Sequence, residues 1–402
     1  MTSASSGWPR DLTVPESGST TAREVLSRAI RRLLGDLQRL PLQRASPRAR
    51  VDFSSFARVA GGLARSNPGA LASLVRRPTV GVLIRCLRGV PGNGLRADGL
   101  VRELSATGCV ELAAMRALPR PVELRAPPRR VVSLAARCVI DIPASARVLR
   151  VSNGEVSIDG LVKPLEPDDA RFVALADAGD PGPVLALVDN NPISDFEAHP
   201  DKQGNALDLG GRSRAEWRAS LSAALDHIAR YMPDLRREIG LIVHQIIPVG
   251  YDDHTHLSAS YQEDIGTLYM TLHPQRMTMV EAVIHEFSHN KINALFEVDG
   301  LLHNAFHPLY KSPVRPDPRP LHGVLLAVHA FQPVARLYER MIEEGADGCQ
   351  HPDFLRRFRR IIDGNHEGAS VLLEHGQPTE IGASVLAEIR RWDDHFAARD
   401  SG

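Results

Sequence analysis

Residues 278–300 read TMVEAVIHEFSHNKINALFEVDG and contain the motif H-E-x-x-H at His285, Glu286 and His289. Two histidines four residues apart lie on the same face of an α-helix, about one turn from each other. Both imidazoles can then bind one metal ion, with the carboxylate of Glu286 beside it. The stretch therefore predicts a helix that carries a metal site.

Local signals favour a helix over this stretch. Thr278 and Glu281 form the T-x-x-E pattern of an N-terminal capping box directly before an apolar run. Apolar residues then recur at helical spacing, and Asp299-Gly300 is a stop signal. We therefore expect the metal helix to begin at the capping box and to end before this pair.

A metal ion needs at least a third protein ligand, and the residues downstream supply candidates. His322 and His329 are separated by two helical turns, or about 10 Å, so only one of them can reach the metal. We prefer His329, because an imidazole deep in the apolar run VLLAVHAF needs a partner. His322 and Glu297 are the alternatives. We expect His303 and His307 to be exposed loop histidines.

The segment VRPDPRP at 314–320 contains prolines that hold it extended and stiff. Arg315 and Arg319 are thus presented from a rigid backbone, and Arg319 comes directly before the helix that contains His329. A guanidinium there can bind a carboxylate in the metal pocket through two hydrogen bonds. Asp317 can pair with Arg315 or orient a ligand histidine. The alternative is a structural turn closed by an ion pair.

Composition limits the class of protein. The 402 residues include 48 basic and 48 acidic side chains, so no net charge draws the chain to nucleic acid or to a membrane. Arginine is concentrated in the first 150 residues, which fits an acidic partner or, as we prefer, a solvated face. The four scattered cysteines are typical of reduced, buried thiols. No apolar stretch has the length of a signal peptide or membrane span. We expect a cytoplasmic protein.

The hydrophobic pattern predicts an α+β fold in four parts. Residues 1–20 have the Ser, Thr, Gly and Pro content of a disordered tail. Residues 21–118 have helical periodicity. Residues 119–210 contain short valine-rich segments and an Asn153-Gly154 hairpin signal, which predict a β-rich part. Residues 211–402 form a mostly helical metal-binding region.

Two segments ahead of the metal helix predict strands. GLIVHQIIPVG at 240–250 has the pattern of a buried strand, and residues 258–272 have that of an edge strand or hairpin. Further helices are expected at 214–232, 321–341 and, at the end of the chain, 352–363 and 380–398.

The stretch HEFSHNKINAL, followed by PVRPDPRPLHGVLLAVHAF, resembles the H-E-x-x-H peptide-modification family that accompanies ribosomally made, modified peptides. The resemblance covers about residues 255–340. It implies an oxygenase dependent on iron(II) and 2-oxoglutarate that β-hydroxylates a side chain, such as aspartate or histidine, in a precursor peptide. By position, it implies metal ligands at His285, His289 and His329, and 2-oxoglutarate contacts at Arg319 and Arg315.

Two other classes of protein also fit the motif. A zinc metallopeptidase would use Glu286 as the base that activates zinc-bound water. Helix 321–341, however, supplies only Glu339 as a third carboxylate ligand, and the third-histidine spacing of metzincins is absent. A peptide-binding protein with merely packed histidines is the other class. We favour the oxygenase, since histidine ligands leave positions for 2-oxoglutarate and O₂ on iron. Glu286 would then support the ligands rather than act as a base.

Overall fold

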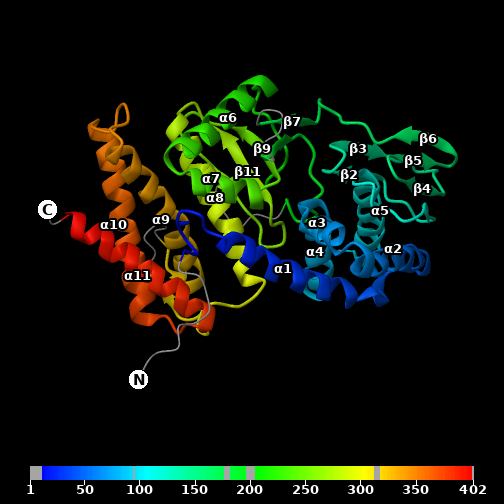
Figure 1. Ribbon diagram of the computed structural model, residues 1–402, viewed down its shortest axis with the longest axis horizontal. Helices are drawn as coiled ribbons and strands as arrows, with labels where there is room; N and C mark the ends of the chain where they lie inside the picture. Colours follow the sequence, from blue (N-terminus) through cyan, green and yellow to red (C-terminus); the bar gives the residue numbers. More distant parts are fainter. Residues whose placement is uncertain (1–10, 94–95, 176–181, 196–203, 312–316, 401–402) are drawn as a thin grey trace. The chain divides into compact units, whose positions relative to one another are not determined.

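The computed structural model describes residues 11–93, 96–175, 182–195, 204–311 and 317–400. Along the sequence, helices dominate near both ends and strands lie in the middle, as the sequence predicts (Figure 1). The chain divides into two compact units. The sheet unit comprises residues 30–218 and 243–272, and the metal-helix unit comprises residues up to 29, 219–242 and 273–402.

Three of the N-terminal helices begin at a proline. The N-terminal helices are α1 (Thr21–Gln38), α2 (Pro47–Ser66), α3 (Pro68–Arg76), α4 (Pro78–Asn93) and α5 (Ala97–Ala114), with a short 3₁₀ turn at Leu42–Arg44. Proline suits the first turn of a helix because its missing N–H has no partner there. The side chain of Ser46 caps α2 by accepting from the backbone N–H of Ala49. Gly108 of α5 lies so close to Phe56 of α2 that a Cβ would clash.

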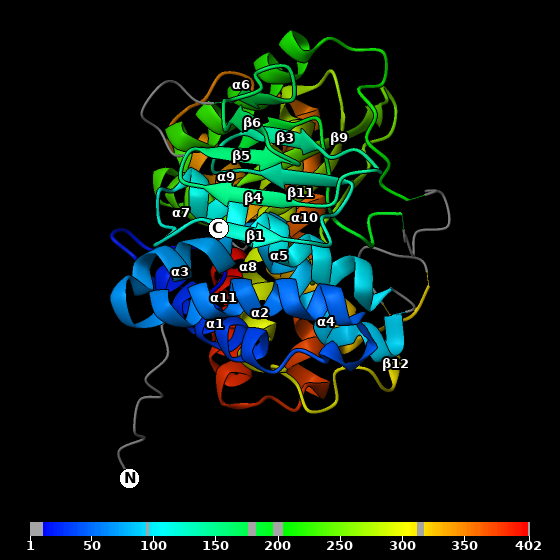
Figure 2. The ribbon, with the colours of Figure 1, turned by 90° about the vertical axis from the view of Figure 1, so that its right-hand side faces the viewer.

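A four-stranded antiparallel sheet packs on α2 and α5 (Figure 2). Its strands, in spatial order, are β1 (Val122–Leu124), β4 (Leu149–Ser152), β5 (Glu155–Ile158) and β6 (Leu161–Pro164). Asn153-Gly154 joins β4 to β5, and Gly154 has a φ of 85°, which confirms the predicted hairpin. A separate hairpin pairs β2 (Arg130–Ser133) with β3 (Cys138–Asp141). These strands and residues 30–118 belong to one unit, although the sequence predicts two subdomains.

A second sheet of the same unit is mixed. Its order is β10 (Ser258–Ala259), β11 (Thr267–Leu272), β9 (Gln245–Tyr251), β8 (Val184–Ala186) and β7 (Phe172–Ala174). The three inner strands are parallel, and the two outer strands are antiparallel to their neighbours. The predicted hairpin at 258–272 is confirmed, because β10 and β11 pair antiparallel. β10 is an edge strand, but β11 is an inner strand, and all six of its residues are buried.

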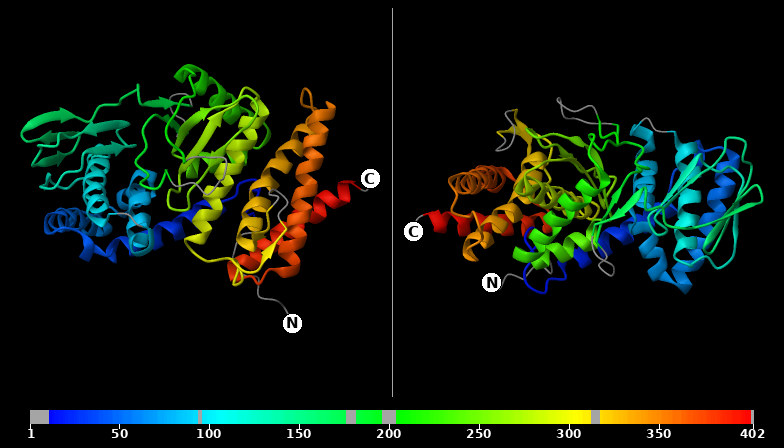
Figure 3. Two further views of the ribbon diagram at one scale, coloured as in Figure 1. Left: turned by 180° about the vertical axis from the view of Figure 1, so that it is seen from behind. Right: turned by 90° about the horizontal axis from the view of Figure 1, so that it is seen from above.

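The metal-helix unit is built mainly from long helices. Its elements are most of α6 (Arg214–Tyr231), α7 (Pro233–Ile242), α8 (Arg276–Phe296), β12 (Leu309–Tyr310), β13 (Arg319–Pro320), α9 (Leu321–Glu343), α10 (Pro352–His375) and α11 (Glu380–Asp400). α9 packs against α8, α10 and α11, and Figure 3 shows α9 and α10 side by side. The predicted strand 240–250 is wrong in its first residues, because residues 240–242 end α7.

The predicted capping box is wrong, although the helix it announced exists. α8 begins at Arg276, and Thr278 lies inside its first turn. Gln275 is the N-cap and makes no side-chain capping bond. Glu281 instead accepts hydrogen bonds from Tyr338 (2.5 Å) and Arg357 (3.1 Å). The helix ends at Phe296, ahead of the predicted stop signal.

The predicted disordered tail is folded from Asp11 onward; residues 1–10 lie outside the described part. The side chains of Leu12 and Val14 are 0% and 4% exposed. All four cysteines are buried and free, as expected. Within the described residues, no helix combines the length and apolar character needed to cross a membrane.

Candidate metal centre

α8 brings the three polar residues of the H-E-x-x-H motif together. Ligand atoms of His285, Glu286 and His289 all lie within 4.8 Å of one another. Nε2 of His289 is 2.9 Å from Nε2 of His285. Two nitrogens about 2.1 Å from one metal ion would lie about 3.0 Å apart at a right angle and about 3.4 Å apart at a tetrahedral angle. The imidazole pair therefore has the spacing to chelate a single ion.

The surroundings of His289 favour a neutral imidazole. Burial lowers the pKa of His289, and the nearby carboxylate of Glu286 acts in the opposite direction. A neutral ring has the free lone pair that a metal requires. Glu286 is only 2% exposed, whereas both histidines are half-buried. The site thus has a buried carboxylate at its base and imidazoles that solvent can reach.

Phe331 of α9 forms one wall of the site. Its ring centroid is 4.8 Å from that of His285, in an edge-to-face contact. Phe331 also lines a small cavity of about 90 Å³ between α9 and α10, together with Arg357, Arg360 and Asn365. Nδ2 of Asn365 is buried and makes no hydrogen bond with any described residue. The cavity has room for a few water molecules or one small polar group.

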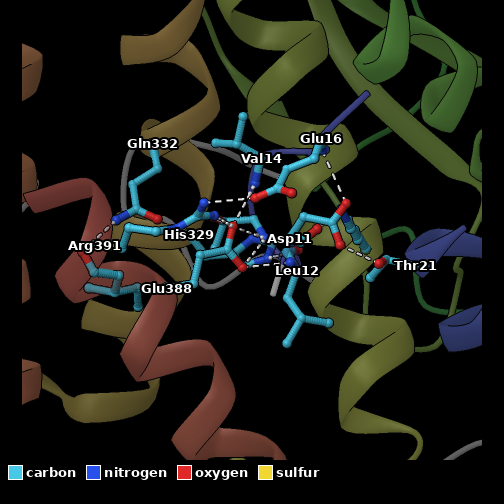
Figure 4. Close-up of polar contacts among 12 residues, drawn as sticks. Asp11, Leu12, Val14, Glu16, Thr21, His329, Gln332, Glu388 and Arg391 are labelled. Atoms are coloured by element: carbon cyan, nitrogen blue, oxygen red, sulfur yellow. Dashed lines mark hydrogen bonds and ion pairs between the residues drawn. The ribbon is translucent and has the colours of Figure 1, made fainter. Parts of the chain in front are cut away.

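The structure gives His329 a partner other than a metal (Figure 4). Its side chain is fully buried, and Nε2 is 3.2 Å from the carbonyl oxygen of Leu12. A carbonyl only accepts, so Nε2 is the protonated nitrogen and Nδ1 carries the lone pair. Nδ1 is buried without a hydrogen-bond partner among the described residues. His329 does not belong to the group of converging ligand atoms, and its role as third ligand stays a prediction that only Nδ1 can fulfil.

The N-terminal segment that meets His329 is held mainly by Glu388 of α11 (Figure 4). Its carboxylate accepts from the backbone N–H groups of Leu12 (2.5 Å), Thr13 (3.1 Å) and Val14 (3.2 Å), and from the Thr13 hydroxyl (2.5 Å). Asp11 accepts from the hydroxyl of Thr21 and from the backbone N–H of Glu16 (3.1 Å). Hydrogen bonds to a charged group are stronger than neutral ones. They order a segment whose composition alone predicts disorder.

The contact between His329 and Leu12 leads to a prediction about pH. Burial, aided by the charge of Lys291, lowers the pKa of His329 to about 3. Below pH ~6.5, His329 therefore binds a proton in the unfolded chain but not in the folded chain. The free energy of unfolding falls as pH decreases toward ~3. His329→Gln keeps a donor for Leu12 but does not titrate. Between pH 6.5 and 4, we expect the unfolding free energy of the parent chain to fall more steeply than that of the variant, by up to ~1.4 kcal/mol per pH unit.

Urea unfolding at a series of pH values measures this difference in slope. Above pH ~7 the two proteins should show parallel curves, because neither binds the additional proton there. Parallel curves over the whole range would show that the His329 ring is not buried against Leu12.

The alternative third ligands also stand apart from the group. His322 lies against Phe296 and Phe306, with ring centroids 4.7 and 5.2 Å away. Burial, followed by the charge of His289, lowers the pKa of His322. Glu297 is buried at the C-terminal cap of α8. Neither places a ligand atom in the converging group. Of the predicted metal ligands, the structure therefore brings together His285 and His289.

Of the two arginines predicted to contact 2-oxoglutarate, the structure describes only Arg319. Arg315 lies outside the described residues. Arg319 is in β13, and its Nε is 2.9 Å from Oδ2 of Asp317. The sequence predicts a pairing of Asp317 with Arg315 or a turn closed by an ion pair, whereas the structure pairs Asp317 with Arg319. The contact of Arg319 with 2-oxoglutarate stays a prediction. His303 and His307 are exposed loop residues, as expected.

Glu339 of α9, the candidate third zinc ligand of a peptidase, already binds other side chains. The carboxylate of Glu339 accepts from His395 (2.8 Å), from Arg399 (2.5 Å) and from Arg336, and its side chain is 1% exposed. A glutamate held by two arginines and a histidine in this way is not free to bind zinc.

Sequence reasoning missed Lys291, the buried cation of the metal helix. Lys291 is 0% exposed, and its Nζ is 2.7 Å from Oε2 of Glu238 on α7 and 3.3 Å from the carbonyl oxygen of Asp11. The position of Lys291 in the sequence could have indicated that it is buried. Ile284, Lys291 and Leu295 fall on one buried stripe of α8, where a lysine requires a partner.

Comparison with known proteins assigns this chain to no family. None of the protein-family models matches it, and a search of curated proteins finds no match either.

Proposed function

We propose that this chain is a cytoplasmic, iron(II)- and 2-oxoglutarate-dependent oxygenase that β-hydroxylates a side chain in a ribosomally made precursor peptide. The observation that carries the proposal is the pair of Nε2 atoms 2.9 Å apart on His285 and His289, with the carboxylate of Glu286 beside them. The resemblance of residues 285–331 to the peptide-modification family supplies the reaction class.

The residues fit an iron site. The two Nε2 atoms are close enough to hold one ion, and two histidine ligands would leave positions for 2-oxoglutarate and O₂ on iron(II). When bound, iron(II) would supply the oxidising chemistry. One atom of O₂ enters the peptide C–H bond as a hydroxyl group, and the other enters succinate as 2-oxoglutarate loses CO₂.

The side chains of this unit would bind, orient and exclude water. His285 and His289 would hold the metal, and the buried Glu286 would fix the orientation of its ligands. Phe331 would keep water from one side of His285. The carboxylates of 2-oxoglutarate require a cation, for which Arg319 is our first candidate and Arg315 our second. Arg360, at the cavity beside Phe331, is a further guanidinium, and it makes no ion pair with any described residue.

A zinc metallopeptidase is the second candidate, and one observation favours it. The carboxylate of Glu286 lies with the two imidazoles, where a base acting on zinc-bound water is needed. The engagement of Glu339 by His395 and Arg399 opposes it, since Glu339 is the glutamate that the sequence offers as third ligand.

Anaerobic reconstitution, followed by an assay with candidate precursor peptides, tests the proposal. We expect the chain to retain iron, to form succinate only when peptide and 2-oxoglutarate are both present, and to add one oxygen atom to the peptide. Tandem mass spectrometry locates the added oxygen. Retention of zinc together with peptide cleavage would replace the oxygenase with the peptidase, and failure to retain either metal would exclude both.

A further inference from the structure

The sheet unit contains a groove of about 960 Å³ that takes no part in the proposed chemistry. It is formed by the start of α2, by α5, by the end of β1 with the loop that follows it, and by the loop between β3 and β4 (Figure 2). All these segments belong to residues 47–148 and thus to one unit. The volume is at the upper end of the range for ligand pockets, so a single phosphate or dicarboxylate would leave most of it filled with water.

Arginine dominates the charge of the groove. Five arginines line it, against two carboxylates, those of Asp52 and Glu123. The arginines are Arg48, Arg102, Arg125, Arg129 and Arg147.

Two of these arginines are already paired. Arg102 lies 2.8 Å from Asp98, and Arg125 lies 3.1 Å from Glu123. The other three, Arg48, Arg129 and Arg147, are exposed and form no ion pair with any described residue. The groove therefore presents three guanidiniums whose charge is not neutralised.

Carboxylate contacts fix the backbone of the groove at two of its arginines, Arg125 and Arg147. Asp52 is 2% exposed and accepts from the backbone N–H groups of Arg125 (2.9 Å) and Ala126 (2.7 Å). The carboxylate of Asp159 accepts from the backbone N–H groups of Arg147 (3.0 Å) and Val148 (2.8 Å). Such a site is organised before its ligand arrives, which lowers the entropic cost of binding.

The remaining lining residues indicate the kind of ligand. They are small and apolar, namely prolines, alanines and valines, and no aromatic side chain is among them. Single-stranded nucleic acid is normally held by aromatic stacking as well as by charge, and stacking is absent here. An extended peptide that alternates carboxylates with apolar side chains matches a groove lined by guanidiniums and small apolar side chains.

We propose that this groove binds an acidic peptide segment, whose carboxylates pair with Arg48, Arg129 and Arg147. The arginine-rich N-terminal region then has a function beyond solvation. The groove includes no residue of the metal helix, so peptide binding can be tested without metal. The result is independent of the proposed oxygenase activity.

Fluorescence anisotropy with the full chain tests the proposal. The probe is a fluorescein-labelled peptide of alternating glutamate and leucine, and two competitors are the same peptide with glutamine in place of glutamate and a single-stranded oligonucleotide of equal charge. We expect the acidic peptide to bind, with affinity that falls as salt rises. Arg129→Glu combined with Arg147→Glu should weaken binding at least ~tenfold, the effect of losing one charge-assisted contact or more.

Arg65→Glu is the control, because Arg65 of α2 is also an exposed arginine but lies outside the groove. It should change the affinity less than ~twofold, as expected for a distant exposed charge. Hydrogen exchange of the complex should show new protection at residues 122–130 and 143–148. Absence of binding, equal weakening by Arg65→Glu, protection elsewhere, or tighter binding of the oligonucleotide would each overturn the proposal.

Discussion

Replacing His285 or His289 with alanine should abolish metal retention and reduce succinate formation by at least ~a thousandfold, the equivalent of ~4 kcal/mol of transition-state stabilisation. The reason is geometric. Their Nε2 atoms are 2.9 Å apart, so each imidazole is half of a chelating pair, and one histidine alone binds a divalent ion weakly. Metal content after anaerobic reconstitution measures the first effect, and succinate yield measures the second.

His303→Ala and His307→Ala are the matched controls for this experiment. Both histidines are exposed, lie in the loop between α8 and α9, and stand apart from the converging group. These variants should retain metal and activity. Circular dichroism should show that the variants at 285 and 289 keep their helices, because both side chains are only half-buried. If metal stays bound at its full ratio without His289, the motif is not the metal site and the proposed function fails.

Sequence periodicity predicted the long helices well and their ends less well. α8 and α9 appear where the apolar stripe places them, since amphipathic periodicity reports directly on burial. The capping box at Thr278 failed for a tertiary reason. Glu281 gains more from Arg357 and Tyr338 than from a backbone N–H at its own helix start. Contacts made by residues far apart in the sequence leave no local signal.

The candidate site shows the same limit. A buried imidazole needs a partner, and His329 has one, but the partner is the carbonyl oxygen of Leu12. Leu12 is placed there by Glu388, a residue 376 positions later in the chain. Composition predicted disorder for this tail because nothing local indicated the carboxylate that orders it. The sequence thus predicted that His329 needs a partner. It did not predict that the partner is the carbonyl oxygen of Leu12.

Lys291→Met should destabilise the chain by ~3–5 kcal/mol, a large share of the stability of an ordinary domain. The substitution leaves Glu238 buried and without its cation, because Lys291 Nζ lies 2.7 Å from its carboxylate. Burial raises the pKa of Glu238, while Lys291 acts to lower it. Urea unfolding monitored by circular dichroism measures the loss. Lys311→Met is the control, since its ion pair with Glu367 is exposed and should contribute less than ~1 kcal/mol.

The double variant Lys291→Met, Glu238→Met shows whether the ion pair itself stabilises the fold. The other possibility is that the single variant is unstable only because it leaves Glu238 buried without a cation. Removing one partner strands a buried charge, whereas removing both leaves apolar side chains of similar size in an apolar setting. We therefore expect the double variant to recover most of the lost stability. A double variant as unstable as the single one would show instead that the bond from Lys291 to the Asp11 carbonyl, 3.3 Å long, holds the N-terminal segment in place.

The pH dependence of the single variant separates these causes further. Without Lys291, the pKa of Glu238 should rise further above its ordinary value. A folded-state pKa above the unfolded value means that the folded state binds the proton more tightly, so protonation favours folding. The deficit of Lys291→Met should therefore be largest near neutral pH and shrink as pH falls toward ~4.5, the ordinary glutamate range. A deficit that does not change with pH would locate the loss in the contact with Asp11 rather than in the stranded carboxylate.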